Sequence, residues 1–208
     1  MTAISNHTTL YYIHDPMCSW CWGYQPTWQQ LRAALPSGLL IKNLLGGLAA
    51  DTDEPMPQTM QVKLQGIWHT IQQQLGTAFN FDFWIKNQPR RATYPACRAV
   101  LAAAAQGQEE AMISAIQRAY YVRALNPSDD DVLLQLAGEL ALDVDQFAAD
   151  IASAVVAAEL QRQISQACHW PIAGFPSLVL VVDDKPIPIA LDYRDYRTSL
   201  ADVNIHLV

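Results

Sequence analysis

The chain has 208 residues, of which 51% are apolar and 16% are charged, and its formal net charge is -7. This composition is typical of a globular protein with a well-buried core rather than of a disordered chain. The acidic charge and the lack of any run of Lys or Arg argue against nucleic acid and against an anionic membrane surface as partners. No apolar run approaches the length of about 20 residues that a transmembrane helix needs.

The first residues, Met1 to Thr9, are polar and contain neither the basic segment nor the apolar segment of a secretory signal peptide. We therefore expect the protein to be cytoplasmic. In that compartment, two cysteines separated by two residues are more often redox-active or metal-binding than a structural disulfide.

A β-branched and aromatic run predicts a first strand from Thr8 to His14. Helical spacing of apolar residues then predicts a helix from Trp22 to Leu35, with Pro26 inside it. An almost wholly apolar run, Leu39 to Leu45, predicts a second strand that is buried on both faces. Because a helix connects the two strands, we expect them to be parallel.

From Asp51 onward the sequence changes character, and no strand pattern interrupts the helical spacing up to about Ala154. The helices expected here and just beyond are Met60–Leu75, Ala96–Ala105, Glu109–Tyr121, one from Asp129 through Leu140, and one or two from Asp143 to about Cys168. We interpret residues 51–154 as an inserted all-helical domain. Residues 1–50 and 155–208 would together form the domain that contains the sheet.

Strand signals return near the end of the chain. The expected elements are a strand Ser177–Val182, a turn Asp183–Lys185, a strand Ile187–Leu191 and a last helix Tyr193–Val203. Pro186 and Pro188 favour an edge position for the final strand, because proline cannot donate to a strand ladder. The sequence therefore predicts an α/β fold with a four-stranded mixed sheet and helices on both faces.

Cys18-Ser19-Trp20-Cys21 lies where the first strand leads into the first helix. The unpaired N–H groups and the dipole of a helix start favour negative charge, so a thiol placed there ionises more easily. The two-residue spacing lets both sulfurs close a small disulfide ring. We predict that Cys18, at the exposed helix tip, attacks a foreign disulfide, and that Cys21, one turn deeper, resolves the mixed disulfide.

The other cysteines do not support a metal site. Structural zinc usually takes four ligands in two clustered pairs, and Cys97, Cys168 and His169 do not form a second pair. We therefore expect no metal and no cofactor. Cys97 and Cys168 are expected to be buried among apolar helical residues. Alternatively, Cys168 and His169 could approach the active site, because they precede Pro176 by only a few residues.

The residues around the motif each have two interpretations. His14 could shift the thiol pKa or relay a proton, and Asp15 could oppose thiolate formation. We expect instead that His14 ends the strand and that Asp15 caps the following turn. Trp22 and Trp28 are expected in the core, whereas Trp20 either covers the helix start or contacts an apolar part of a substrate.

The order of elements, the Cys18–Cys21 motif, Pro26 five residues later, and Gly174-Phe175-Pro176-Ser177 before a strand resemble the DsbA-type branch of the thioredoxin superfamily. Within that branch, the sequence most resembles the cytosolic members of the disulfide isomerase type. The resemblance covers essentially the whole chain and implies a thioredoxin-like fold. It also implies a cis-proline at Pro176 opposite the cysteines, with Phe175 offering backbone hydrogen bonds to an extended substrate and with Ser19 and Trp20 completing the redox-active centre.

The resemblance implies a thiol–disulfide oxidoreductase or protein disulfide isomerase. Its partners would be disulfide-containing proteins or small thiols, and a reductant or oxidant thiol system. Trp20 stands where the periplasmic oxidant of this group has a His, and an indole cannot stabilise a thiolate as an imidazolium can. We therefore expect an intermediate reduction potential rather than a strongly oxidising one.

Two other functions remain open from the sequence. The first is a glutathione-linked transferase or isomerase of the kappa-class or hydroxychromene-carboxylate isomerase type, which shares this fold with its helical insertion. Those relatives usually keep a serine at the nucleophile position and lack the second cysteine, so the presence of both Cys18 and Cys21 favours redox chemistry. The second is a binding module in which the dithiol is a redox switch.

Overall fold

The computed structural model describes residues 8–207, so residues 1–7, on which the expected lack of a signal peptide depends, lie outside it. The strands β1 (Thr8–His14), β2 (Leu40–Leu45), β3 (Ser177–Val182) and β4 (Lys185–Ile189) form one sheet in the order β2-β1-β3-β4. β1 is parallel to β2 and antiparallel to β3, and β4 is antiparallel to β3. The predicted α/β fold with a four-stranded mixed sheet is confirmed.

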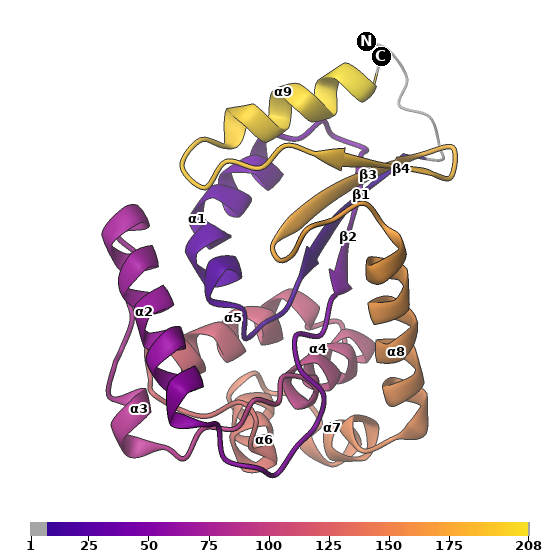
Figure 1. The fold of residues 1–208 in the computed structure, drawn as a ribbon. Helices are drawn as coiled ribbons and strands as arrows, with labels where there is room; N and C mark the ends of the chain where they lie inside the picture. Colours follow the sequence, from indigo (N-terminus) through magenta and orange to yellow (C-terminus); the bar gives the residue numbers. More distant parts are fainter. Residues whose placement is uncertain (1–7, 208) are drawn as a thin grey trace.

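Helices cover both faces of the sheet, but the edge strand β2 is only partly buried. The prediction that it is buried on both faces is wrong, since Leu40 is 50% exposed. The side chains of β1 alternate, with Leu10 and Tyr12 in the core on one face and with Tyr11 and Ile13 packed on the other. The helices α1 (Ser19–Ala34) and α9 (Tyr196–His206) cover the first face, and α8 (Ala154–His169) covers the second (Figure 1). This double burial explains why β1 reads as an apolar and aromatic run along its whole length.

Six helices lie between β2 and α8 in the chain, and in Figure 1 they lie mainly below the sheet, with α2 rising beside α1. They are α2 (Gln58–Leu75), α3 (Phe83–Lys86), α4 (Tyr94–Ala105), α5 (Glu109–Tyr121), α6 (Asp130–Glu139) and α7 (Val144–Ile151). The alanine-rich α4 is their centre and contacts α5, α6, α7 and α8, because its small buried side chains allow close approach. Among the described helices, none is both long and apolar enough to cross a membrane. The division into domains of residues 1–50 with 155–208 and of residues 51–154 stays a prediction.

The predicted bounds of the last strand are wrong by two residues, since β4 runs from Lys185 to Ile189 rather than from Ile187 to Leu191. Asp183 and Asp184 have positive φ angles of 46° and 64°. Two residues with positive φ make a tight hairpin turn, so the strand begins directly at Lys185.

Several helices also begin or end away from their predicted positions, and α2 and α4 each begin two residues earlier than expected. α1 begins at Ser19 rather than at Trp22, and α9 begins at Tyr196 because the Asp195 side chain accepts the Arg197 N–H and caps the helix. The long helical pattern that ends near Cys168 is divided at Ser153, whose hydroxyl accepts the Val156 N–H and starts α8. The four-residue α3 was not predicted, because it makes only about one helical turn and is too short to show a repeating apolar pattern.

We predict that Phe147→Ala lowers the free energy of unfolding by about 3–5 kcal/mol, because Phe147 is fully buried in the core of the helices and its removal leaves a cavity. Urea unfolding followed by far-UV circular dichroism measures this change. Val155→Ala is the matched control, since Val155 is 78% exposed and its truncation should change stability by less than about 0.5 kcal/mol. Equal losses in the two variants would contradict the assignment of this core.

Candidate active site

Cys18 is the N-cap residue of α1. Its backbone N–H donates to the Asp15 carbonyl at 3.0 Å, and its own carbonyl accepts the Trp22 N–H at 3.0 Å. The thiol is therefore at the helix start, as predicted, but it is not at an exposed tip, because Cys18 is only 7% exposed. Cys21, one turn further, is fully buried, and both cysteines are free thiols. Burial raises the pKa of the Cys21 thiol well above its usual range, and the adjacent Cys18 sulfur raises this pKa further.

The loop before β3 covers Cys18. The Cys18 thiol donates to the Phe175 carbonyl at 3.5 Å across 157 residues of sequence. The peptide bond between Phe175 and Pro176 is cis, the geometry that the resemblance implies. The Phe175 ring lies directly on the main chain of Gly46, where any Cβ would overlap the ring. The end of β2, the Phe175–Pro176 loop and the start of α1 thus meet at the cysteine pair.

Asp15 is a fully buried carboxylate just before the motif. It accepts the Met17 N–H at 2.8 Å, the Leu48 N–H at 2.8 Å and the Thr93 hydroxyl at 2.6 Å. The Cys97 thiol donates to the same side chain at 3.6 Å. Burial raises the pKa of Asp15, while these hydrogen bonds act in the opposite direction. Asp15 caps the turn as expected, and it also joins the motif to the segment after β2 and to the start of α4.

Tyr121, at the end of α5, holds the motif from the helical side. Its hydroxyl donates to the Met17 carbonyl at 2.7 Å. Its ring stacks on Trp22 with centroids 5.8 Å apart and meets Trp68 edge-on at 5.3 Å. This role of Tyr121 could not be predicted, since a tyrosine at the end of an amphipathic helix gives no sign of a partner 104 residues away.

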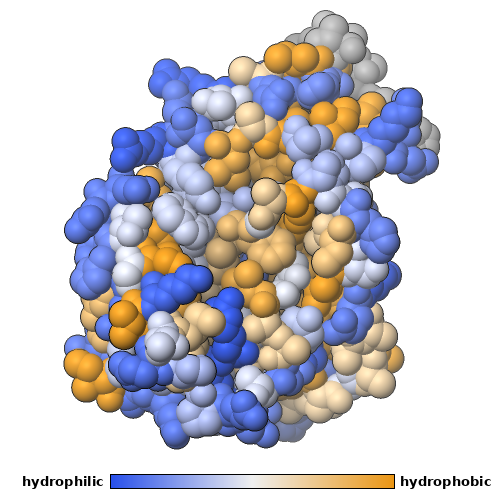
Figure 2. Space-filling view, viewed as in Figure 1, coloured by the Kyte–Doolittle hydropathy of each residue, from blue (hydrophilic) through white to orange (hydrophobic). Residues whose placement is uncertain are grey.

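A cavity of ≈ 220 Å³ adjoins Cys18. Its walls are Met17, Cys18, Ser19, Trp20, Leu48, Met56, Leu64, Ile67, Trp68, Arg90, Arg91, Thr93, Tyr120 and Phe175. Apolar side chains gather at the middle of the face in Figure 2, between the sheet and the helices below it, with hydrophilic side chains around them. Trp20 packs edge-on against Tyr193 at 5.1 Å beside the helix start and also lines the cavity, and its contact with a substrate stays a prediction.

Two arginines give the cavity a positive wall. Arg90 forms an ion pair with Asp129 at 2.6 Å and donates to the Ser128 carbonyl. The ion pairs within residues 8–207 do not include Arg91. Arg91 is thus a cation that can meet an anionic group beside Cys18. Arg91 was not predicted as a site residue, and its signal in the sequence is a pair of adjacent arginines in an acidic chain.

His14 ends β1, as expected, and is fully buried with its ring stacked on Tyr12 at 4.9 Å. Within the described part of the chain, neither ring nitrogen has a hydrogen-bond partner. Burial lowers the pKa of His14 to about 3, so the imidazole is neutral at pH 7. His14 is not among the residues that line the cavity.

The remaining cysteines differ from each other. Cys97 is fully buried, as expected, whereas Cys168 is exposed, so the prediction that it is buried is wrong. Cys168 lies on the solvent side of α8, and neither it nor His169 lines the cavity beside Cys18. Over residues 8–207, no group of three or more His, Cys, Asp or Glu side chains has the arrangement of a metal site.

A family model described as thioredoxin matches residues 11–189, and the chain therefore belongs to the thioredoxin family. Among solved structures, a proposed protein disulfide isomerase from Nitrosomonas europaea is 28% identical with a TM-score of 0.85, and the match covers 97% of this chain and 98% of that one. The cytosolic disulfide reductase DsbM from Pseudomonas aeruginosa is 28% identical with a TM-score of 0.75, and the match covers 96% of each chain. A structure of DsbM with GSH gives a TM-score of 0.73. The predicted thioredoxin-like fold and the resemblance to the DsbA-type branch are confirmed.

The chain is also similar to curated proteins that are named as adapter proteins. The ClpXP adapter protein SpxH of Bacillus subtilis is 24% identical over 172 residues. That match covers 81% of this chain but only 56% of the relative, so the chain spans little more than half of SpxH.

We predict that His14→Phe makes the protein less sensitive to acid. The pKa of His14 is about 3 in the folded protein and 6.5 in the unfolded chain, so between these values only the unfolded chain binds the proton. Protonation of His14 in the unfolded chain therefore lowers the free energy of unfolding by about 2 kcal/mol at pH 5.0 and by almost nothing at pH 7.5. Phenylalanine keeps the ring that stacks on Tyr12 but cannot titrate.

Urea unfolding of both proteins at pH 7.5 and pH 5.0 measures the effect. The stability difference between His14→Phe and the parent protein should shift by about 2 kcal/mol in favour of the variant at the lower pH. An unchanged difference would mean that His14 does not stay neutral in the fold.

Proposed function

We propose that the protein is a cytoplasmic thiol–disulfide oxidoreductase in which Cys18 attacks and Cys21 resolves. The observation that carries this proposal is the position of the Cys18 thiol at the start of α1, 3.5 Å from the Phe175 carbonyl, with the fully buried Cys21 one turn behind it. The similarity to a cytosolic disulfide reductase supports both the reaction and the compartment.

The exchange proceeds in two steps. The Cys18 thiolate attacks one sulfur of a substrate disulfide, forms a mixed disulfide and releases the other substrate sulfur as a thiolate, which takes up a proton. Cys21 then loses its proton and attacks the Cys18 sulfur, which releases the second substrate thiol. Two electrons pass from the dithiol to the substrate, and a thiol reductant must reduce the Cys18–Cys21 disulfide before the next turnover. In isomerisation, a second cysteine of the substrate would instead attack the substrate sulfur of the mixed disulfide and release the Cys18 thiolate.

The walls of the cavity suggest how a substrate would lie. The Phe175 carbonyl would accept a backbone N–H from an extended substrate next to its disulfide. Trp20 would offer an apolar surface to the residues that flank this disulfide, and Ser19 and Pro176 would complete the groove beside Cys18. In the structure, the Cys18 thiol donates to this Phe175 carbonyl.

The substrate class follows from Arg91. A cation in the wall of a cavity of ≈ 220 Å³ favours a small thiol or disulfide that carries a carboxylate. The structure of the related reductase with GSH supports a substrate of this kind. Protein substrates are supported by the curated relatives, which are named as adapter proteins.

We predict that a limiting dose of iodoacetamide on the reduced protein labels Cys18 before Cys21, because Cys21 is fully buried and its pKa is raised by burial. Cys168 is exposed, so the experiment uses a Cys168→Ser background. Peptide mapping by mass spectrometry gives the order of labelling. First label on Cys21 or Cys97 would contradict the assigned roles.

The function itself is tested by insulin reduction. Cys18→Ser should abolish the activity, and Cys21→Ser should accumulate mixed disulfides through Cys18 because no thiol remains to resolve them. Recovery of activity from scrambled ribonuclease would separate isomerisation from simple reduction. Full insulin reduction by Cys18→Ser would refute the proposal, and binding without any exchange would favour a redox-switched binding module.

We predict that Arg91→Gln lowers kcat/KM for oxidised glutathione by about tenfold, because it removes a charge-assisted contact to a carboxylate. The neutral bis(2-hydroxyethyl) disulfide should react at an unchanged rate. Arg32→Gln is the matched control, since Arg32 lies on α1 outside this cavity and pairs with Glu110. Equal losses with both disulfides would show that Arg91 does not select an anionic substrate.

A further inference from the structure

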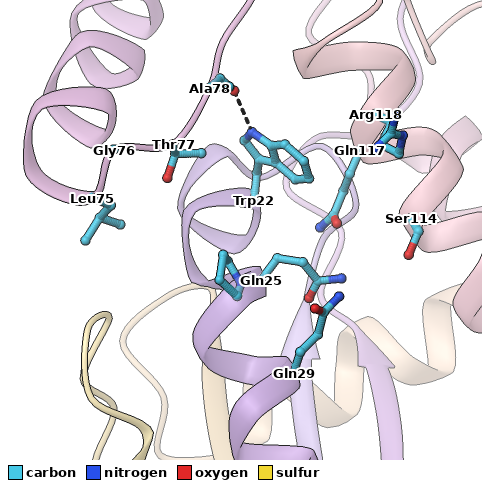
Figure 3. Close-up of a pocket in the computed structure, with 11 residues that line it drawn as sticks. Trp22, Gln25, Gln29, Leu75, Gly76, Thr77, Ala78, Ser114, Gln117 and Arg118 are labelled. Carbon is cyan, nitrogen blue, oxygen red and sulfur yellow. Dashed lines mark hydrogen bonds between the residues drawn. The ribbon is translucent and has the colours of Figure 1, made fainter.

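A second cavity, of ≈ 530 Å³, lies between α1, α5 and the irregular segment that follows α2 (Figure 3). It shares no lining residue with the cavity beside Cys18. Its volume is within the range of sites that bind small molecules or short peptide segments. The proposed exchange chemistry does not use it.

Three glutamine side chains converge on this cavity. Gln25 and Gln29 reach it from α1 and Gln117 reaches it from α5, and the three side chains point toward one another in Figure 3. Gln117 is only 1% exposed, and its Oε1 has no hydrogen-bond partner among the described residues. A buried acceptor without a donor is destabilising, so this oxygen favours an occupant that brings an N–H or O–H group.

The third wall is formed by residues 75–78, at the end of α2 and in the segment that follows it. The Trp22 Nε1–H donates to the Ala78 carbonyl at 3.0 Å and fixes the segment after α2 against α1. In residues 8–207, the backbone N–H groups of Thr77 and Ala78 donate no hydrogen bond. Unused main-chain donors beside a cavity are suited to the main chain of another polypeptide.

The spacing of the α1 glutamines fits an extended chain. Gln25 and Gln29 are four residues apart, so they lie on one face of the helix about 6 Å from each other. An extended polypeptide presents main-chain groups on the same side every two residues, about 6.6 Å apart. Each glutamine amide has both donors and an acceptor, as a peptide group does. A chain that lies along α1 would therefore offer one peptide group to each glutamine.

We infer that the cavity between α1 and α5 binds a short extended polypeptide segment through its main-chain amides. The glutamine amides would bind the main chain of the segment, while Trp22, Pro26 and Leu75 in the wall favour small apolar side chains. Arg118, on the cavity wall, would tolerate an acidic side chain or a chain terminus. This binding goes beyond the proposed function, since it needs neither Cys18 nor Cys21.

The test is an NMR titration of the 15N-labelled, reduced protein with N-acetyl-trialanine amide. We expect saturable shifts of the side-chain NH2 groups of Gln25, Gln29 and Gln117 and of the Trp22 indole N–H. A matched depsipeptide, in which an ester oxygen replaces the central N–H, should bind at least about threefold more weakly because it lacks one donor.

Gln117→Met keeps the length of the side chain and removes its amide, so it should raise the Kd for the peptide about three- to tenfold. Gln30→Met is the matched control, since Gln30 is exposed on α1 outside the cavity and its variant should bind the peptide unchanged. If Gln117→Met does not fold by circular dichroism, the double variant Gln25→Met, Gln29→Met carries the same expectation.

Several outcomes would overturn the inference. These are shifts that grow linearly without saturation, equal binding of the peptide and the depsipeptide, or an unchanged Kd in the folded variants. Saturable shifts centred on Trp20 and Phe175 would also overturn it, because they would place the peptide in the cavity beside Cys18.

Discussion

The buried carboxylate of Asp15 is the constraint on which the geometry around the cysteine pair depends. A charged carboxylate without access to water is stable in a fold only when hydrogen bonds replace its hydration. Asp15 obtains them from the backbone of Met17 and Leu48 and from the Thr93 hydroxyl. Those donors belong to three different segments, so the turn before Cys18 cannot move without the loop after β2 and the start of α4. The helical layer is in this way part of the machinery that positions the motif.

Aromatic rings make a second connection between the helical layer and the motif. Trp22 lines the cavity between α1 and α5, Trp68 lines the cavity beside Cys18, and Tyr121 packs against both rings. Tyr121 also holds the carbonyl of Met17, the residue before Cys18. Packed aromatic rings therefore lie between the two cavities, and the Tyr121 hydroxyl bonds this layer of rings to the backbone that leads into the motif.

Local signals predicted most of the elements but few of the contacts between them. β1, β3 and α5 have the bounds that periodicity and composition indicate, and the motif lies at a strand-to-helix junction as expected. The small exposure of Cys18 could not be predicted, because it depends on Phe175 far along the chain. The exposure of Cys168 depends on how α8 is rotated against the sheet, and the register of β4 depends on two aspartates that adopt positive φ without a glycine. Arg91 was missed because only the folded chain brings it to the cavity.

The prolines of β4 have a consequence for how the folded protein meets other chains. An edge strand with free N–H groups can pair with a strand of another molecule and begin an aggregate. Alternate residues of a strand point their N–H groups the same way, so Pro186 and Pro188 remove two donors from one side of β4. At the opposite edge, the Asn43 side chain of β2 donates to Glu109 and Glu110 at the start of α5, and this contact ties a helix to the strand. One edge of the sheet thus lacks two backbone donors, and at the other edge a helix start is held beside the strand. Both features disfavour growth of the sheet by strand addition.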